Sequence, residues 1–316
     1  MSGPRQTGKT TLAKSIQKTF SNTEYFNWDV LTHKRKLIES PYFFQNVNRT
    51  DNTQPLVILD EIHKYKDWKN YLKGVYDEFA GDFKFLITGS GRLDTFVKGG
   101  DSLAGRYFML HLFPFTVSEL ALNKRRDAND WMTELDINDA SETGRIWSNL
   151  FITGGFPEPF INGSESFFNK WTNTYIRQII KEDVRSFSDV RNIETLELMY
   201  SLMPSKVGSP LSVNSLAGDL QVSFDTVKSW LLLLEKIFLS FRLTPWTKKI
   251  TRAITKECKW YLYNYAEIDE PAMRFENMVA MELMRSIKLW NETGAGSYSL
   301  HYIRNKEKHE VDFLIA

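Results

Sequence analysis

One stretch near the start of the chain limits the possible folds more than any other part of the sequence. Residues 3–11 read Gly-Pro-Arg-Gln-Thr-Gly-Lys-Thr-Thr and fit the pattern G-x-x-x-x-G-K-[ST] without a mismatch. The two glycines let the backbone curl around a phosphate chain, with main-chain N–H groups directed inward at the N-terminus of the next helix. The pattern therefore predicts a phosphate-binding loop, followed by a helix that includes residues 12–18.

The spacing also predicts what the loop residues do. Lys9 would reach the β- and γ-phosphates of a nucleotide, and the Thr10 hydroxyl would ligate Mg²⁺. The predicted nucleotide-binding residues are Gly3, Pro4, Arg5, Gln6, Thr7, Gly8, Lys9, Thr10 and Thr11. The alternative is a glycine-rich turn that precedes a helix by chance, so the sequence context has to decide between the two.

An acidic strand tip further along the chain favours the phosphate loop. The apolar run Leu56–Leu59 follows Pro55 and ends in Asp60 and Glu61, which is typical of a strand buried on both faces. In an open α/β sheet, ligands bind at the carboxyl ends of the strands. We therefore expect Asp60 to hold Mg²⁺, through water, and Glu61 to act as the catalytic base that polarises the attacking water.

Length and charge limit the class of protein. A chain of 316 residues is long enough for two or three domains. Its 40 Lys+Arg against 39 Asp+Glu leave a net charge of +1, so no global field recruits nucleic acid or an acidic membrane. The single cysteine, Cys258, excludes an intrachain disulfide and a multi-cysteine zinc site. With no apolar run of about 18 residues, we expect a cytoplasmic protein with no membrane contact.

The residues before the loop are too few for a strand. Only Met1 and Ser2 precede Gly3, whereas a strand takes roughly five or six residues. We expect the strand that leads into the loop to be missing and favour a fragment, the alternative being that another segment fills the gap. Without that strand, its two neighbours each lose a hydrogen-bonding partner.

Strands and helices alternate over residues 1–125. Apolar residues recur at helical spacing at Trp68, Leu72, Val75 and Phe79, which predicts a crossover helix over 67–79. The ranges predicted as strands are 23–29, 56–60, 83–88 and 107–112. This order predicts a parallel sheet with helices on both faces.

Three further residues lie where they would contact a bound triphosphate. Thr88 and Ser90 follow the strand 83–88, where a polar side chain would touch the γ-phosphate or orient water; the alternative is a turn that satisfies its own backbone. Arg106 lies just beyond the sheet, where an arginine would meet transition-state charge in the same subunit or a neighbour. The alternative for Arg106 is an ordinary surface arginine.

Five segments together resemble a known family. They are Gly-Pro-Arg-Gln-Thr-Gly-Lys-Thr-Thr, Leu-Asp-Glu-Ile-His-Lys, Thr-Gly-Ser, Ser-Leu-Ala-Gly-Arg and Pro-Phe-Thr-Val-Ser-Glu-Leu. In this order they resemble the AAA-type prokaryotic and archaeal ATPases, and within them the AAA_14 group that carries a C-terminal DUF4143 domain. The resemblance implies an α/β P-loop NTPase fold and ATP as the nucleotide. Independently, the sequence has no Asn-Lys-x-Asp guanine signal.

The rest of the chain is predicted to form three further parts. Residues 126–190 are charged and helical, as expected of a linker or lid. Residues 191–247 have the pattern of a winged helix-turn-helix, with helices at 196–202, 211–220 and 224–236 and a strand at 237–243. Few residues near the start of the helix 224–236, the second helix of the helix-turn-helix, suit base reading, so DNA binding and protein docking both stay open. A modest basic stretch follows at 248–258.

The last part, residues 248–316, resembles the first half of a nuclease-like α/β domain of the PD-(D/E)xK kind. Glu276 on a predicted helix and Asp312 on a predicted strand carry this resemblance. That chemistry needs a further acid and a lysine on the next strand. The sequence ends before such a strand, so we predict no nuclease activity from this part as it stands.

Two functional hypotheses follow. The first is a Mg²⁺-dependent ATPase whose nucleotide state repositions the C-terminal parts. The second is a nucleotide-gated module that binds DNA or protein and does not hydrolyse ATP. Both use the same residues, and both allow an oligomer.

Overall fold

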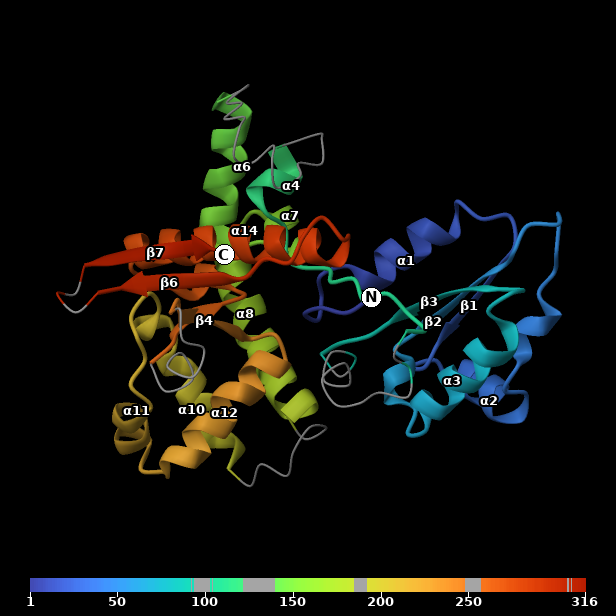
Figure 1. The fold of residues 1–316 in the computed structure, drawn as a ribbon, viewed down its shortest axis with the longest axis horizontal. Helices are drawn as coiled ribbons and strands as arrows, with labels where there is room; N and C mark the ends of the chain where they lie inside the picture. The colour runs from blue at the N-terminus through green and yellow to red at the C-terminus, as the bar shows by residue number, and fades with distance from the viewer. Residues whose placement is uncertain are drawn as a thin grey trace. The chain divides into compact units, whose positions relative to one another are not determined.

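The computed structural model divides the chain into two compact units, Met1–Leu112 and Phe113–Ala316 (Figure 1). It describes every residue except positions 92, 94–102, 104, 122–139, 185–191, 248–256, 306 and 308. The second unit includes most of what the sequence predicts as three separate parts. The boundaries at residues 125, 190 and 247 stay predictions.

The first unit contains a parallel three-stranded sheet in the order β1-β2-β3. The strands are β1 (Thr23–Asn27), β2 (Leu56–Asp60) and β3 (Lys84–Thr88). Every residue of the central strand β2 is buried, as its unbroken apolar run predicts. The register aligns Asn27, Asp60 and Thr88 at the carboxyl ends of the three strands. Polar side chains from all three strands therefore meet at one edge.

Helices cover both faces of this sheet. They are α1 (Lys9–Gln17), α2 (Leu31–Glu39) and α3 (Trp68–Phe79), with 3-10 turns at Phe43–Asn46 and Ile62–Lys64. Leu56 and Ile58 pack with Ala13 of α1, whereas Val57 and Leu59 pack in a second cluster with the four apolar residues predicted for the crossover helix. This alternation along β2 follows from the two-residue period of a strand, and it confirms the predicted layers.

The predicted strand at 107–112 is wrong as a full strand. The segment is extended, but only His111 forms a β-bridge, to Ser2. Ser2 donates its amide to the carbonyl of Leu110 (2.9 Å), and the Met1 amino group donates to the carbonyl of Ile87 on β3 (2.6 Å). A strand forms only where a partner supplies hydrogen bonds. Ser2 bonds only to the C-terminal end of the segment 107–112, so residues 107–109 stay outside the sheet.

The second unit is mainly helical. Thr116 precedes the helix α4, which is followed by two helices that a turn at Gly154 (φ 71°) separates. The described helices are α4 (Val117–Ala121), α6 (Ala140–Thr153), α7 (Pro157–Asn162), α8 (Glu165–Ile179), α10 (Ile193–Leu202), α11 (Val213–Leu220), α12 (Phe224–Lys236) and α14 (Pro271–Glu292), with a π turn at Ile180–Val184 and 3-10 turns at Pro204–Lys206 and Tyr265–Glu267.

Helices α11 and α12 are joined by a tight turn. Gln221 adopts the left-handed conformation (φ 54°) that ends α11. The hydroxyl of Ser223 then accepts the amide of Thr226 (3.1 Å) and caps α12, as the sequence predicts for a serine in this position. The helices and their connection therefore agree with the expected helix–turn–helix order.

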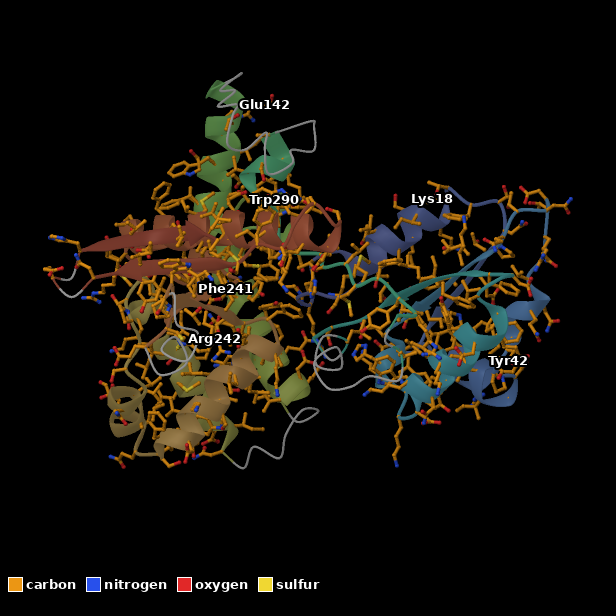
Figure 2. All side chains as sticks on the ribbon, in the orientation of Figure 1. Lys18, Tyr42, Glu142, Phe241, Arg242 and Trp290 are labelled. Atoms are coloured by element: carbon orange, nitrogen blue, oxygen red, sulfur yellow. The ribbon has the colours of Figure 1, made fainter. Side chains whose placement is uncertain are left out.

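A mixed four-stranded sheet completes the second unit, in the order β5-β4-β6-β7. Its strands are β4 (Ser240–Pro245), β5 (Lys259–Leu262), β6 (Leu300–Arg304) and β7 (Glu310–Ile315). Along β4, Phe241 is buried and the next residue, Arg242, is exposed (Figure 2). Residues from Phe113 to Tyr302 share one hydrophobic core, to which α6, α8, α10, α11, α12, α14, β4 and β5 all contribute.

Two expectations concern the surface of the molecule. Among the described residues, no helix is long and apolar enough to cross a membrane. Most of the predicted basic stretch, 248–256, lies outside the described residues.

Candidate nucleotide-binding site

The loop 3–11 has the backbone conformations that its glycines permit. Gly8 precedes α1 in the left-handed region (φ 92°). Gly3 has φ 141°, and a Cβ there would overlap the carbonyl of Leu112. A side chain at either position would therefore distort the loop. The first turn of α1 follows directly, so its free N–H groups lie at the loop, as anion binding requires.

The Lys9 side chain is folded over the loop. Its ammonium donates to the carbonyl of Gly3 (2.9 Å) and to that of Pro4, and the side chain is buried. The Thr7 hydroxyl donates to the Pro4 carbonyl (2.9 Å). The ammonium is thus held at the concave side of the loop, where a phosphate chain would lie.

The loop and the acidic strand tip are in direct contact. The Thr10 hydroxyl donates to Oδ2 of Asp60 over 2.7 Å, although fifty positions separate the two residues. Mg²⁺ in nucleotide sites takes one or two protein oxygens and completes its shell with phosphate and water. A threonine hydroxyl and a carboxylate at contact distance fit this ligand set, so the residues present are compatible with Mg²⁺.

Asp60 is fully buried, and four donors compensate its charge. Besides Thr10, they are the hydroxyl of Tyr25 (2.8 Å), the amide of Asn27 (3.3 Å) and the hydroxyl of Thr88. A buried carboxylate is stable only with such hydrogen bonds. Burial raises the pKa of Tyr25 to about 12, and the hydrogen bond to Asp60 adds to this, so the phenol stays a donor at neutral pH.

Tyr25 and Asn27 are not among the residues predicted for the site from the sequence. Both lie on β1, and the parallel register pairs Asn27 with Asp60. Their spacing of two residues on the strand beside the acidic tip was the signal that would have found them, because residues two apart share a face.

Glu61 has an uncommon backbone conformation, and its carboxylate lies beside the side chains of Lys64 and His63. Its φ of 57° lies in the left-handed region, which non-glycine residues adopt at a cost. Its Oε2 lies 3.0 Å from the ammonium of Lys64 and 3.8 Å from Nε2 of His63. Lys64 also donates to Asp29 over 2.6 Å. The position of the predicted base is therefore set by ion pairing, which the sequence analysis also missed.

The contacts of Lys64 with Asp29 and Glu61 favour its protonated form. Burial alone lowers its pKa, but the hydrogen bond to Asp29 and the charge of Glu61 outweigh this, so its pKa lies above the usual value. The raised pKa keeps Lys64 a cation at neutral pH.

The two predicted sensors have different surroundings. Thr88 is fully buried and bonded to Asp60, so it belongs to the same polar cluster as Thr10. The hydroxyl of Ser90 lies 3.3 Å from Nε2 of His63, which also lies near Glu61. Both residues are thus connected to the acidic tip, Ser90 through His63.

The remaining predicted residues are less closely connected. Arg106 forms an ion pair with Asp77 on α3 (2.7 Å), and none of its described contacts reaches the phosphate loop. Thr11 is exposed on α1. Gln6 adopts a positive φ of 60° within the loop. The structure therefore brings together Lys9, Thr10, Asp60, Glu61 and Thr88 but leaves Arg106 apart.

A second polar cluster lies in the other unit, around the predicted nuclease-like residues. The fully buried ammonium of Lys259 lies 2.8 Å from Asp312, 2.6 Å from Glu310 and 3.4 Å from Glu276. The hydroxyl of Tyr261 donates to Glu276 (2.7 Å). A further acid and a lysine were expected on a later strand, whereas here an acid, Glu310, lies on β7 itself and a lysine, Lys259, lies on β5.

These contacts determine the charge of the second cluster. Burial raises the pKa of Glu276. Burial also lowers that of Lys259, but its hydrogen bonds to Asp312 and Glu310 outweigh this effect and raise it. The lysine thus fills the space between the three carboxylates. Among the described residues, no group of His, Cys, Asp and Glu is arranged to hold a metal ion by itself.

Two family models match the chain, one mainly in each of the two structural units. Residues 1–121 match the model of an AAA domain, and residues 144–266 match a domain of unknown function, DUF8612. The C-terminal resemblance to DUF4143 is not shown, since a different domain model matches there.

Three curated proteins are similar to this chain. Uncharacterized proteins of Mycobacterium tuberculosis (Rv2008c) and Mycobacterium bovis (Mb2031c) are each 22% identical over 262 residues, covering 83% of this chain and 53% of their own length. The uncharacterized protein MJ1637 of Methanocaldococcus jannaschii is 26% identical over 271 residues, covering 77% of this chain and 56% of its own length. The chain thus spans about half the length of the curated relatives it matches.

A solved structure is also similar, at a low level. It is the Aeropyrum pernix ORC1 protein in complex with DNA, with 12% identity and a TM-score of 0.36 over 89% of this chain and 86% of that one. At this score the likeness carries no functional argument. The match over residues 1–121 does, and the first unit is accordingly similar to AAA domains, which are ATP-binding P-loop NTPases.

Proposed function

We propose that this chain binds ATP with Mg²⁺ in its first unit and hydrolyses it. The observation that carries the proposal is the 2.7 Å hydrogen bond between Thr10 and Asp60. It places the hydroxyl of the phosphate loop and the carboxylate of the acidic strand within reach of one ion. The match of residues 1–121 to an AAA domain supports the same function.

Each residue of the cluster then has a role. Lys9 exchanges the loop carbonyls of Gly3 and Pro4 for phosphate oxygens, which are stronger acceptors because they are charged. Thr10 and Asp60 would hold the ion, which would supply charge stabilisation to the phosphates. Glu61 accepts a proton from the attacking water, and its ion pair with Lys64 orients it.

Thr88 and Ser90 position residues of the proposed site through hydrogen bonds. Thr88 donates to Asp60 and fixes the rotamer of that carboxylate. Ser90 contacts His63, which lies 3.8 Å from Glu61. Arg106 is joined to Asp77, so we assign it to transition-state charge in a neighbouring subunit rather than in its own.

The second unit is proposed to act as the partner-binding part. Two features support a winged-helix arrangement. The helices α11 and α12 follow each other across a turn, and the strands β4 and β5 form an antiparallel pair. The contacts among Glu276, Asp312 and Lys259 support a nuclease-like sheet whose cluster is closed by an ion pair. The partner is DNA or a protein, and the nucleotide state of the first unit would control its binding.

The alternative is a module that binds nucleotide without hydrolysing it. The experiment that decides is steady-state ATP hydrolysis by the purified protein with and without Mg²⁺, next to the Glu61→Gln variant. We expect Glu61→Gln to keep ATP binding and to lose turnover by about 100-fold or more, as removal of a general base does. The exposed Glu39→Gln at the end of α2 is the matched control. Equal turnover in the wild type and Glu61→Gln would refute hydrolysis at this site.

A further inference from the structure

The imidazole of His63 lies between the predicted base and one of the predicted sensors. Its Nε2 is 3.3 Å from the hydroxyl of Ser90 and 3.8 Å from Oε2 of Glu61. Glu61 directly follows β2, and Ser90 lies just beyond the end of the neighbouring strand β3. The ring therefore bridges the ends of the two strands that carry the chemistry of the proposed site.

The ring of His63 is tightly enclosed. His63 is 3% exposed and lies on the 3-10 turn Ile62–Lys64. On the side of β3 it packs against Gly89, where an added Cβ would overlap Nδ1. The ring can approach Ser90 this closely because the residue before Ser90 is a glycine.

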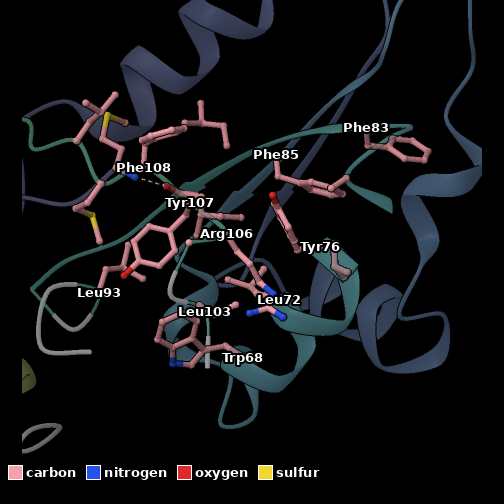
Figure 3. A pocket seen from close by; sticks show the side chains of 18 residues that line it. Trp68, Leu72, Tyr76, Phe83, Phe85, Leu93, Leu103, Arg106, Tyr107 and Phe108 are labelled. Atoms are coloured by element: carbon pink, nitrogen blue, oxygen red, sulfur yellow. Dashed lines mark hydrogen bonds between the residues drawn. The ribbon is translucent and has the colours of Figure 1, made fainter. Parts of the chain in front are cut away.

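The backbone of Ser90 is also fixed, whereas its hydroxyl has a torsion of its own. The Ser90 carbonyl accepts the amide of Leu93 (3.0 Å). The Leu93 side chain is buried and lines an apolar pocket of about 490 Å³ beside β3 (Figure 3). A change of rotamer at Ser90 therefore moves the hydroxyl away from His63 and leaves this turn in place.

The two distances indicate that Nε2 serves one partner at a time. Hydrogen bonds of this kind are about 2.7–3.2 Å long, so the contact with Ser90 is a weak hydrogen bond and Glu61 is beyond reach. A carboxylate only accepts, so Nε2 must carry the proton in order to bond to Glu61. A neutral imidazole has a single N–H, which at Nε2 donates either to Ser90 or to Glu61.

We propose that His63 is a positioning residue that transmits the presence of a γ-phosphate from Ser90 to Glu61. This relay rests on the function proposed above. The Ser90 hydroxyl turns to a phosphate oxygen, which is a stronger acceptor because it is charged. The Nε2–H of His63 then loses Ser90 as its partner and donates to Oε2 of Glu61.

The relay gives the two carboxylate oxygens of Glu61 separate tasks. Lys64 lies 3.0 Å from the same oxygen, Oε2, that His63 approaches. With both donors on Oε2, the carboxylate is fixed and Oε1 accepts the proton of the attacking water. Before a triphosphate is bound, Lys64 alone restrains the carboxylate, so the base is fully oriented only when there is a phosphate to cleave.

The first test observes the ring directly. Long-range ¹H–¹⁵N spectra show which ring nitrogen carries the proton, and His63→Gln identifies the signal of His63 among the five histidines. The non-hydrolysable analogue β,γ-imido-ATP is compared with ADP, each saturating and with Mg²⁺. We expect the Nε2 signal of His63 to move with the analogue and not with ADP, and this difference to vanish in Ser90→Ala. The exposed His309 is the internal control.

The second test is a double-mutant cycle on turnover. His63→Phe keeps a ring of similar size but lacks Nε2, and it should lower kcat about tenfold while KM changes less than about twofold. In a Ser90→Ala background the same change should cost less than about twofold, because the relay is already broken. In the control background Ser40→Ala, an exposed serine of the same unit, it should keep its full effect. His63→Gln, whose amide also donates, should restore part of the rate.

Three results would overturn the relay by itself. They are binding of both nucleotides with the same His63 signal, an Nε2 without a proton when the analogue is bound, and an equal effect of His63→Phe in both backgrounds. The last result would mean that His63 only packs. Binding without turnover would refute hydrolysis, and the ring spectra would then decide the relay. A protein that binds neither nucleotide would refute the proposed function and the relay together.

Discussion

The ammonium of Lys64 lies 3.0 Å from the carboxylate of Glu61, within a single turn at the end of β2. The same ammonium is anchored to Asp29 at 2.6 Å. A flexible glutamate with three side-chain torsions is thus restricted by a neighbour that is itself fixed. In the proposed mechanism, this restriction orients the Glu61 carboxylate towards the attacking water.

We therefore expect Lys64→Met to impair turnover more than binding. Without the ion pair, Glu61 samples orientations that do not reach the attacking water, so kcat should fall about tenfold while KM stays nearly constant. Steady-state kinetics over a range of ATP concentrations checks this. The exposed neighbour Lys66→Met is the control. An unchanged kcat in Lys64→Met would mean that the ion pair does not orient the base.

The contact between Thr10 and Asp60 leads to a prediction about magnesium. Thr10→Val keeps the shape of the side chain but removes the oxygen that would ligate the ion. We expect the affinity for ATP to fall about tenfold or more with Mg²⁺ present, and to change little in EDTA. Isothermal titration calorimetry under both conditions measures the difference.

Thr11→Val is the matched control, because Thr11 is exposed on the same helix. Asp60 keeps Tyr25, Asn27 and Thr88 as donors in Thr10→Val, so the free energy of unfolding should fall by only about 1 kcal/mol. A larger loss would mean that the contact is mainly structural.

The partly buried Glu267 is expected to make the stability of the second unit depend on pH. Burial raises its pKa from 4.5 to about 8, and the Tyr200 hydroxyl donates to it at 3.1 Å. The folded state therefore keeps a proton that the unfolded state loses. The stabilisation is complete below pH 4.5 and is lost as pH rises to about 8.

Glu267→Gln should remove this dependence. The free energy of unfolding of the wild type should fall by a few kcal/mol between pH 5 and about 8, whereas that of the variant should stay nearly flat. Urea denaturation at several pH values measures both. Asp269→Asn, at an exposed position two residues away, should behave like the wild type. A wild type without the decline would show that Glu267 is ionised in the folded protein.

The cluster around Lys259 is expected to be sensitive to loss of its cation. Lys259→Met leaves the carboxylates of Glu276, Glu310 and Asp312 close together without the cation they share, so the free energy of unfolding should fall by about 3–5 kcal/mol. Urea denaturation at pH 7 checks the loss, and Lys288→Met on the exposed face of α14 is the control. Adding Glu310→Gln to Lys259→Met should restore part of the stability. A double variant as unstable as the single one would argue against charge as the cause.

Much of the first unit follows from local sequence patterns. The unbroken apolar run of β2 and the spacing of Trp68, Leu72, Val75 and Phe79 each reflect burial that a residue's near neighbours determine, and the structure has both elements where they were expected. The caps and turns of α11 and α12 also follow from local chemistry. The loop 3–11 meets Asp60 because parallel strands place their carboxyl ends at one edge.

What the sequence did not reveal depends on register between distant segments. Tyr25 reaches Asp60 only because β1 and β2 pair at one particular offset, and Lys259 meets Asp312 only because β4 and β6 join two separate pieces of sheet. The prediction of a full strand at 107–112 is wrong for a related reason. The local pattern of this segment suits a strand, but a strand forms only where a neighbouring segment supplies hydrogen bonds along its whole length.

The shared core of the second unit limits how this part of the molecule can respond to a signal. Side chains from α6 through α14 and from β4 and β5 are interleaved in one close-packed interior, which resists sliding of one layer past another. The helix-turn-helix and the sheet that carries Lys259 therefore cannot swing separately. In the function proposed above, a signal from a bound nucleotide would therefore act on these described elements together.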